Sequence, residues 1–182
     1  MKADFLKSQK IIHWIMAIII MLDLNIAQKF GSEMDNLDRL ESRIDHTSVG
    51  LFITFLFLLR VFLRYKYGSP GYPDSMPRWQ VISAKVGHYG LYFLMGGLIV
   101  TGLLTARYAT DPILAFNTLN LTMGNGDLQI YNVIRFFHEV FTNVIIAFIA
   151  IHIFASMYHH FIAKDSTTLN MIKFWKNSLK SN

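Results

Sequence analysis

The stretch NVIRFFHEVFTNVIIAFIAIHIFASMYHHFI, from Asn132 to Ile162, decides the fold expected of this chain. It is almost wholly apolar, and it is longer than the about 20 residues that a helix needs to cross a bilayer. We therefore expect a transmembrane helix whose far end extends into water. Two of its histidines, His138 and His152, lie 14 residues apart.

Three further apolar stretches precede it, at about 11–27, 47–65 and 81–105. The chain of 182 residues is 53% hydrophobic and only 16% charged, whereas a soluble domain carries about 25% charged residues. We predict one domain, an all-α membrane protein in which four transmembrane helices form a bundle in the lipid bilayer. The first stretch is too long, and too polar at its far end, for a cleaved signal peptide, so we expect it to be retained.

The distribution of lysine and arginine predicts the orientation, because cytoplasmic loops carry an excess of both. One side holds most of them: Lys2, Lys7, Lys10, Arg64, Lys66, Arg78, Lys85, Lys164, Lys173, Lys176 and Lys180. The other side holds Lys29, Arg39, Arg43, Arg107 and Arg135. Both termini are therefore expected in the cytoplasm.

The connections between the spans also carry signals. The inner loop 68–73 (GSPGYP) is expected to be non-helical, because its prolines and glycines break helices. The first outer loop, roughly 28–45, is polar and acidic, and the second, roughly 106–131, contains Asp111-Pro112 and Gly124-Asn125-Gly126, which indicate turns. Cysteine is absent, which excludes disulfides and covalently attached haem. The basic residues line no single polar face, so no nucleic-acid partner is expected.

Histidines at matching depths predict the chemistry. His138 and His152 face the same way on one helix, because 14 residues are nearly four turns, and they are about 21 Å apart along the axis. His13 lies at the depth of His152 on the cytoplasmic side, and His46 lies at the depth of His138 on the outer side. We therefore predict two haems b, the inner iron held by His13 and His152 and the outer iron by His46 and His138. Ligation by two imidazoles suits electron transfer.

Three other residues in these spans have two interpretations each. Arg60 lies 14 residues after His46, at the inner depth, where it would pair with a haem propionate or snorkel to headgroups. Gly50, one turn after His46, would let a porphyrin approach or simply serve helix packing. Asp23 either pairs with a group inside the bundle or sits at the interface.

A possible quinone site follows His152 on the cytoplasmic side. His159, His160 and Lys164 place titratable groups beside the inner haem, and a quinone needs hydrogen-bond donors and protons when it is reduced. The alternative is a solvated helix end. His88 is expected at the inner depth, either as a rival ligand of the inner iron or as a polar contact near the quinone.

These residues resemble the bacterial cytochrome b561 family, whose best-characterised members are superoxide oxidases. The likeness covers nearly the whole chain. It rests on Ile12-His13-Trp14, His46 with Gly50 and Arg60, Leu63-Arg64-Tyr65-Lys66-Tyr67, Gly87-His88, His138-Glu139, His152, the string His159-His160-Phe161-Ile162-Ala163-Lys164-Asp165, and Thr168-Leu169. The resemblance implies a di-haem four-helix bundle in the bacterial inner membrane. It also implies that electrons from an outer donor such as superoxide reach ubiquinone near the inner haem.

Three functions compete. The first is an oxidoreductase that passes electrons from superoxide to ubiquinone. The second is a cytochrome b anchor subunit that receives electrons from a partner dehydrogenase or hydrogenase, since related subunits serve such enzymes. The third is a haem-free transporter or scaffold. The acidic first outer loop does not favour the attraction of a superoxide anion.

Overall fold

The structure is a computed structural model that describes residues 4–28, 35–123 and 126–174. Its long elements are the helices α1 (Lys7–Gln28), α2 (Asn36–Tyr67), α3 (Arg78–Tyr108) and α4 (Leu128–Met157). Several residues used in the predictions above lie outside the described part of the chain. They are Lys2, Lys29, Gly124, Asn125, Lys176 and Lys180.

The ends of these helices follow from local chemistry. α2 ends where Gly68 adopts a left-handed conformation (φ 67°), which glycine does at no steric cost. Pro77 stands at the N-cap of α3, and the 68–77 connection before it is not helical, as predicted. At the start of α4 the Asp127 carboxylate accepts hydrogen bonds from the backbone N–H groups of Gln129 and Ile130, at 2.9 and 3.0 Å.

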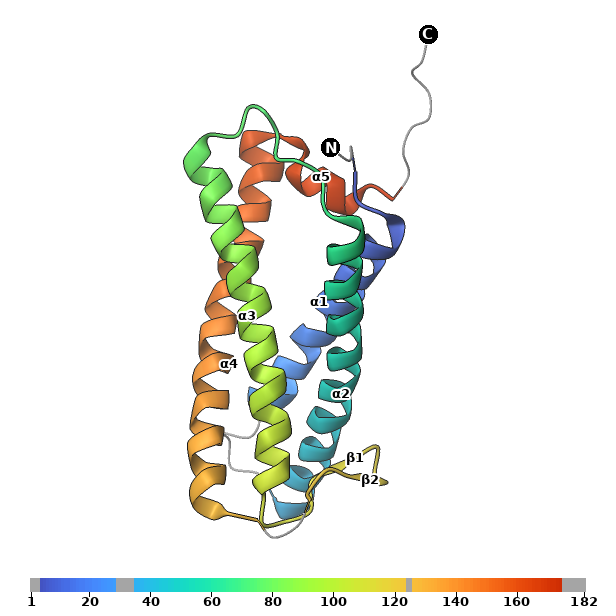
Figure 1. Ribbon diagram of the computed structural model, residues 1–182, viewed down its shortest axis with the longest axis vertical. Coiled ribbons are helices and arrows are strands. Elements are labelled where there is room, and N and C mark those ends of the chain that lie inside the picture. The colour runs from blue at the N-terminus through green and yellow to red at the C-terminus, as the bar shows by residue number, and fades with distance from the viewer. Residues whose placement is uncertain (1–3, 29–34, 124–125, 175–182) are drawn as a thin grey trace.

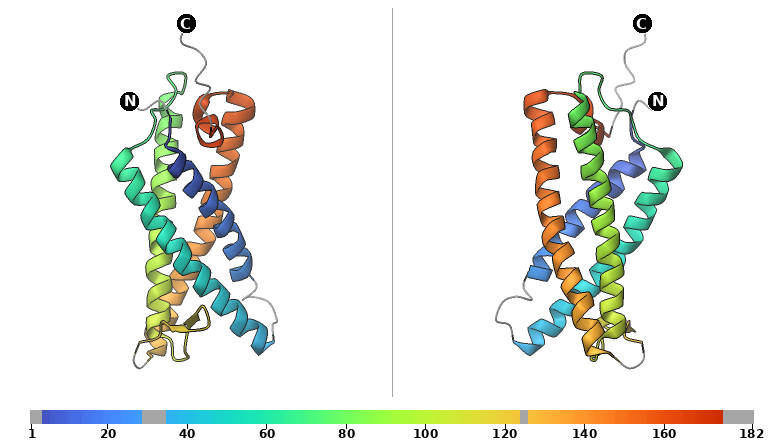
Figure 2. Two further views of the ribbon diagram at one scale, coloured as in Figure 1. Left: turned by 90° about the vertical axis from the view of Figure 1, so that its right-hand side faces the viewer. Right: turned by 60° about the vertical axis from the view of Figure 1, so that its left-hand side comes forward.

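The helices pack as two pairs. α1 lies against α2 and α3 lies against α4, while few contacts join α2 to α3. Figure 2 shows that α1 and α2 cross the bundle at an angle to the nearly upright α3 and α4. The Gln9 side chain ties the first pair together by donating to the carbonyls of Leu63 (3.3 Å) and Gly68 (3.0 Å). The interior between the pairs is therefore where a cofactor can lie.

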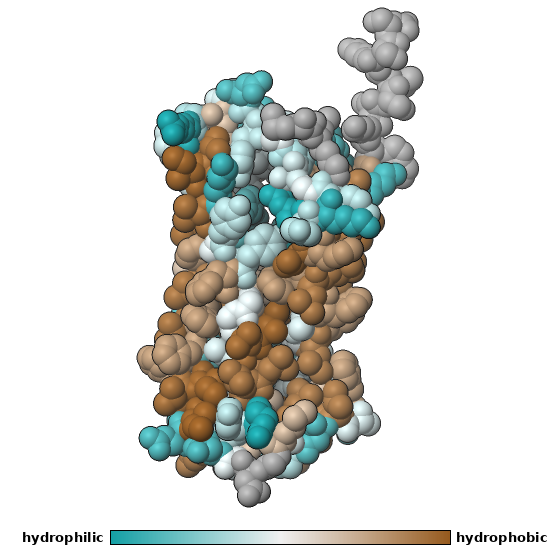
Figure 3. Space-filling view, in the orientation of Figure 1, coloured by the Kyte–Doolittle hydropathy of each residue, from teal (hydrophilic) through white to brown (hydrophobic). Residues whose placement is uncertain are grey.

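The outer surface of the bundle suits a lipid environment. Each of the four helices is long and apolar enough to cross a membrane. Large hydrophobic side chains such as Phe55, Phe93, Phe154 and Ile162 are exposed, which lipid but not water would favour. In Figure 3 hydrophobic residues cover the middle of the molecule and hydrophilic ones gather toward its two ends. The four-helix membrane fold predicted from the sequence is confirmed.

The helices extend beyond the predicted spans. Much of the segment expected to be the first outer loop, 28–45, is helical, because α2 already begins at Asn36. The second outer connection contains a small hairpin of β1 (Leu114–Ala115) and β2 (Leu119–Asn120), and α4 begins at Leu128. We call this the hairpin end of the molecule.

The opposite end carries an element that the sequence did not predict. After α4 the chain continues as a π-helix, η2 (Tyr158–Ala163), and then turns into a short helix, α5 (Ser166–Ile172). Lys164 makes this turn in a left-handed conformation (φ 52°). In Figure 1 α5 lies at the same end as the start of α1 and the connection between α2 and α3. We call this the α5 end.

Candidate functional site

The four histidines predicted as ligands meet in the interior as two pairs. The ring centroids of His13 and His152 lie 6.2 Å apart, with the ring planes at 79°. Those of His46 and His138 also lie 6.2 Å apart, at 81°. The first pair joins α1 to α4 toward the α5 end, and the second joins α2 to α4 toward the hairpin end. Both pairs therefore bridge the two helix pairs of the bundle.

The spacing within each pair fits one metal ion between two imidazoles. A metal–imidazole bond is about 2.0 Å long and the ring centroid lies about 1.2 Å beyond the nitrogen, so opposite ligands place their centroids about 6.4 Å apart. Both observed distances come close to this value. The described residues hold no group of three or more ligating side chains that could bind a metal ion. An iron held here would thus need most of its ligands from a group such as a porphyrin.

Hydrogen bonds orient both rings of the pair near the hairpin end. Nδ1 of His46 donates to Oδ1 of Asp23 at 2.9 Å. Nδ1 of His138 donates to Oγ1 of Thr101 at 2.8 Å, and the Thr101 hydroxyl in turn donates to the Gly97 carbonyl at 2.7 Å. Both Nδ1 atoms are hydrogen-bonded to protein oxygens, so a metal would have to bind through Nε2. Histidines that bind metals commonly donate their other ring N–H to a protein oxygen in this way.

The pair near the α5 end has a different environment. Within the described chain, neither the His13 ring nor the His152 ring makes a side-chain hydrogen bond. The ring of His88 lies 5.5 Å from that of His152, at 66°, which is shorter than the spacing that two opposite ligands require. Arg60 lies within electrostatic reach of all three histidines. The positive charge of Arg60 therefore acts on this pair.

Arg60 and Gly50 both suit a large anionic group, Arg60 through its positive charge and Gly50 through the open space beside it. Arg60 is half-buried, and it makes no hydrogen bond or ion pair with any residue in the described ranges. An intramembrane arginine needs an anionic partner, and haem propionates are anionic. A Cβ atom added to Gly50 would meet nothing within 4 Å, so open space lies beside α2 one turn from His46. The residues present thus fit a haem, and their roles as haem contacts stay predictions.

At the α5 end the structure separates the residues predicted for a quinone site. His159 Nδ1 donates to the Asp165 carboxylate at 2.6 Å, and both side chains are about nine-tenths buried (11% and 10% exposed). Lys164 is exposed. In contrast, Nδ1 of His160 is buried with no hydrogen-bond partner among the described residues, and so is Oγ1 of Thr167. His159 is already engaged in a structural contact, while His160 is not.

Asp165 also caps α5, and its pKa reflects these contacts. Burial alone would raise the pKa of this carboxyl, but hydrogen bonds from Thr167 and from His159 outweigh burial and lower the pKa below its usual value. The Thr167 backbone N–H donates to Oδ1 at 2.8 Å. Asp165 therefore stays ionised at neutral pH and fixes the turn between η2 and α5.

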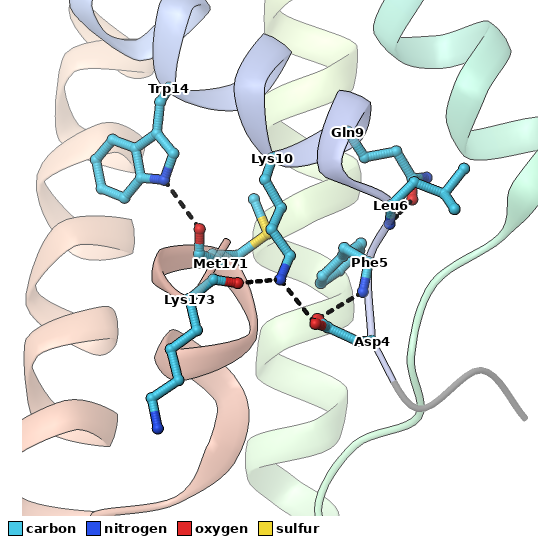
Figure 4. Close-up of polar contacts among 8 residues, drawn as sticks. All are labelled: Asp4, Phe5, Leu6, Gln9, Lys10, Trp14, Met171 and Lys173. Carbon is cyan, nitrogen blue, oxygen red and sulfur yellow. Dashed lines mark hydrogen bonds and ion pairs between the residues drawn. The ribbon is translucent and has the colours of Figure 1, made fainter. Parts of the chain in front are cut away.

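Polar contacts attach α5 to the start of α1, close to His13 in sequence (Figure 4). Nε1 of Trp14 donates to the Met171 carbonyl at 3.1 Å. Nζ of Lys10, only 2% exposed, donates to the Lys173 carbonyl at 2.6 Å and pairs with Asp4 at 2.8 Å. α5 thus closes over the α1 side of the bundle at this end.

The sequence does not predict the role of two residues in this arrangement. It leaves two interpretations open for Asp23, and the structure places this residue against His46. It gives no indication for Thr101, because a threonine in an apolar span carries no signal of its own. Only the positions of α1 relative to α2, and of α3 relative to α4, show that these side chains reach the ligand rings.

A bundle of membrane-spanning helices with histidines facing one another in its interior is the architecture of membrane cytochromes of the b type. A family model described as prokaryotic cytochrome b561 matches residues 5–174. The chain therefore belongs to the prokaryotic cytochrome b561 family of membrane electron-transfer proteins, which implies that it binds haem b.

Individual relatives agree with this assignment. The chain is 27% identical to cytochrome b561 homolog 1 of Escherichia coli K12 over 171 residues, which is 92% of this chain and 96% of that protein. It is 26% identical to cytochrome b561 homolog 2 of the same organism, over 88% of this chain and 86% of the relative. It is also 22% identical to the probable superoxide oxidase CybB of Yersinia pestis, over 88% of this chain and 91% of the relative.

Proposed function

We propose that this protein is a di-haem oxidoreductase that takes electrons from superoxide at the hairpin end and passes them to ubiquinone near the α5 end. The observation that carries the proposal is the pair of equal ring spacings, 6.2 Å between His13 and His152 and 6.2 Å between His46 and His138. Haem iron supplies one-electron redox chemistry, and the protein sets access and potential. The four histidines would hold the two irons, and Arg60 would bind a propionate of the inner haem.

The orientation belongs to the same proposal. The α5 end carries Lys7, Lys10, Arg64, Lys66 and Arg78, and the positive-inside rule would place it in the cytoplasm of a bacterium, with the chain in the inner membrane. The hairpin end then faces outward. Superoxide would lose one electron to the outer haem there and leave as dioxygen. Two such electrons, with two protons from the cytoplasmic side, convert ubiquinone to ubiquinol.

The quinone would bind at the α5 end, with His160 as the preferred contact. A buried polar atom without a partner costs free energy, on the order of 1–3 kcal/mol, unless a ligand satisfies it. Nδ1 of His160 is such an atom. His88 lies beside His152 and offers a second polar contact near the inner haem. His159 would act indirectly, because it is bonded to Asp165, and Lys164 would lie at the exposed margin.

The superoxide step would receive electrostatic support from Arg107 at the hairpin end. Arg107 is exposed and donates to the Met123 carbonyl. Arg135 contributes less, because Glu139 neutralises it at 2.9 Å. An exposed cation near the outer haem attracts an anionic donor, and that attraction weakens as salt rises.

A second candidate function has its own observation. Asp38, Glu41 and Asp45 are exposed on the first turns of α2 at the hairpin end. An acidic surface at the outer entrance is suited to a basic protein donor, as a cytochrome subunit of a dehydrogenase or hydrogenase would need. In that case a stoichiometric redox partner would copurify with the protein, whereas superoxide would not reduce it efficiently.

The test is a visible spectrum followed by an activity assay on the protein purified in detergent. We expect two low-spin haems b per chain, and reduction of a ubiquinone analogue when superoxide is generated. A colourless protein would indicate the transporter or scaffold function instead. Superoxide oxidation no faster than that by free haem would exclude the oxidase function even if both haems are present.

A further inference from the structure

The two histidine pairs differ most in the charges that touch them. At the hairpin end the carboxylate of Asp23, only 13% exposed, accepts the Nδ1 hydrogen bond of His46 at 2.9 Å. At the α5 end the cation Arg60 acts electrostatically on both His13 and His152. An anion therefore lies behind one pair, and a cation lies beside the other.

A carboxylate bonded to a coordinating imidazole does more than hold the ring. It draws the Nδ1 proton toward itself and makes Nε2 a stronger donor to the metal, which raises ligand basicity. A more basic axial ligand and a nearby negative charge both favour ferric over ferrous iron. A hydrogen bond to an axial ligand is one of the means by which a protein sets the reduction potential of a haem.

The other ligand of the same pair provides an internal comparison. His138 donates its Nδ1 hydrogen bond to Thr101, a neutral hydroxyl that itself donates to Gly97. This contact orients the ring without adding charge. Asp23 therefore adds charge through a ligand hydrogen bond, whereas Thr101 adds none.

We infer that Asp23 is a positioning residue for His46 whose negative charge lowers the reduction potential of the outer haem. With Arg60 beside the inner pair, the potential then rises from the outer haem to the inner one. An electron passing inward would then oxidise ferrous iron at the outer site and reduce ferric iron at the inner site, with no bond broken and no proton required. The inference rests on the proposed function, because it assumes that the two histidine pairs hold haem.

The test is a redox titration of purified Asp23→Asn followed in the visible spectrum. Asparagine keeps an acceptor oxygen for the His46 bond but removes the charge. We expect the equilibrium constant for reduction of the outer haem to rise about tenfold, which is about 59 mV for one electron, while the inner midpoint stays unchanged. A His138→Ala variant, retaining only the inner haem, assigns the two midpoints.

Two controls separate the charge of Asp23 from other effects. Asp38→Asn removes an exposed carboxylate of the same end that contacts no ligand ring, and it should leave both midpoints in place. Thr101→Val removes the neutral hydrogen bond to His138 and should shift the outer midpoint by less than Asp23→Asn does. Asp23→Ser, a second neutral variant, covers the case in which asparagine distorts the site.

The outcomes distinguish this inference from the proposed function. Fewer than two haems in the wild-type protein, counted as pyridine haemochromogen, would refute the di-haem proposal. Two haems with an unmoved outer midpoint in Asp23→Asn, or an equal shift of both midpoints, would overturn only the role of Asp23. Loss of the outer haem in both neutral variants would also overturn it, because Asp23 would then be required for binding rather than for tuning.

Discussion

The histidine pair near the hairpin end (the proposed outer pair) and the pair near the α5 end (the proposed inner pair) have the same spacing but are held in different ways. Both ring pairs lie 6.2 Å apart with nearly perpendicular planes. The outer rings are fixed by hydrogen bonds to Asp23 and Thr101, whereas no such side-chain bond fixes the inner rings in the described structure. The inner pair lies instead beside His88 and within electrostatic reach of Arg60.

Under the proposed function, this difference would suit the two ends to different tasks. A site at which a small outside molecule gives up an electron needs fixed ligands and a set potential, which hydrogen bonds to the ligand rings provide. A site that passes electrons to a larger acceptor needs groups that bind the acceptor, such as the buried Nδ1 of His160, which has no hydrogen-bond partner among the described residues. The identical spacing keeps both sites equally suited to iron.

Removing one ligand from each pair is the strongest test of the comparison. His152→Ala should remove the inner haem and leave the outer one, and His138→Ala should do the reverse. Each variant should therefore contain half of the wild-type haem, because an axial ligand from α4 cannot be replaced by an apolar side chain. Haem counting with the midpoint of the remaining haem provides the measurement.

The same experiment tests which histidines hold the same iron. If His152→Ala lost the outer haem alone, the assignment of His13 with His152 would be wrong. His88→Ala distinguishes the rival ligand: it should retain both haems, since the ring of His88 lies only 5.5 Å from that of His152. Loss of the inner haem in His88→Ala with retention in His13→Ala would reverse the assignment.

The four ligand candidates were within reach of the sequence because helical periodicity is a strong constraint. The 14-residue interval between His138 and His152 fixes a common face and a separation along α4. The positions of the spans then place His13 and His46 at the two depths. Each of these inferences needs only the geometry of a single helix or the thickness of the membrane.

The supporting residues were not predictable, because they depend on how helices cross. Asp23 and His46 lie on different helices, and their contact requires the observed packing of α1 against α2. The hairpin turn was missed for a different reason. Phe116 and Asn117 both adopt positive φ (53° and 58°), but Phe-Asn is not the Asn-Gly signature of such a turn.

The helix α5 illustrates the same limit. Seven residues are too few to form a stable helix by themselves. This one is held by the Asp165 cap and by distant contacts such as Trp14 with Met171. The sequence shows Asp165 before a short polar segment, but nothing in it shows that the segment packs on α1.

Arg60 allows a second test, directed at the inner pair alone. Arg60→Gln should speed the loss of the inner haem to excess apomyoglobin by about tenfold or more, because a hydrogen bond to a charged group contributes about 1.5–3 kcal/mol. The outer haem should be lost at the wild-type rate. Arg78→Gln, an exposed arginine at the same end, is the matched control. Equal loss of both haems would contradict the assignment of Arg60 to the inner site.

The cap of α5 gives a third and smaller effect. Asp165→Ala removes the N-cap acceptor, which typically costs a helix about 0.5–2 kcal/mol of stability, so trypsin should cleave after the exposed Lys164 about 2-fold to 30-fold faster at pH 7. Because the pKa of Asp165 is lowered, the stabilisation is present at neutral pH and is lost only as the pH falls through that lowered value. Asp127→Ala, at the cap of α4, controls for a general loss of stability. Unchanged cleavage in Asp165→Ala would mean that the cap does not hold α5.

The smallest expected effect concerns the neutral hydrogen bond of the outer pair. Thr101→Val keeps the shape of the side chain but removes the oxygen that accepts from His138 Nδ1, and a neutral hydrogen bond contributes about 0.5–1.5 kcal/mol. Outer haem should therefore dissociate about 2-fold to 10-fold faster. Thr142→Val is a close control, since Thr142 bonds to the His138 backbone carbonyl rather than to its ring. If both valine variants lost outer haem equally, loss of helix packing rather than of ring orientation would explain the effect, and the outer pair would no longer differ from the inner pair in how its rings are held.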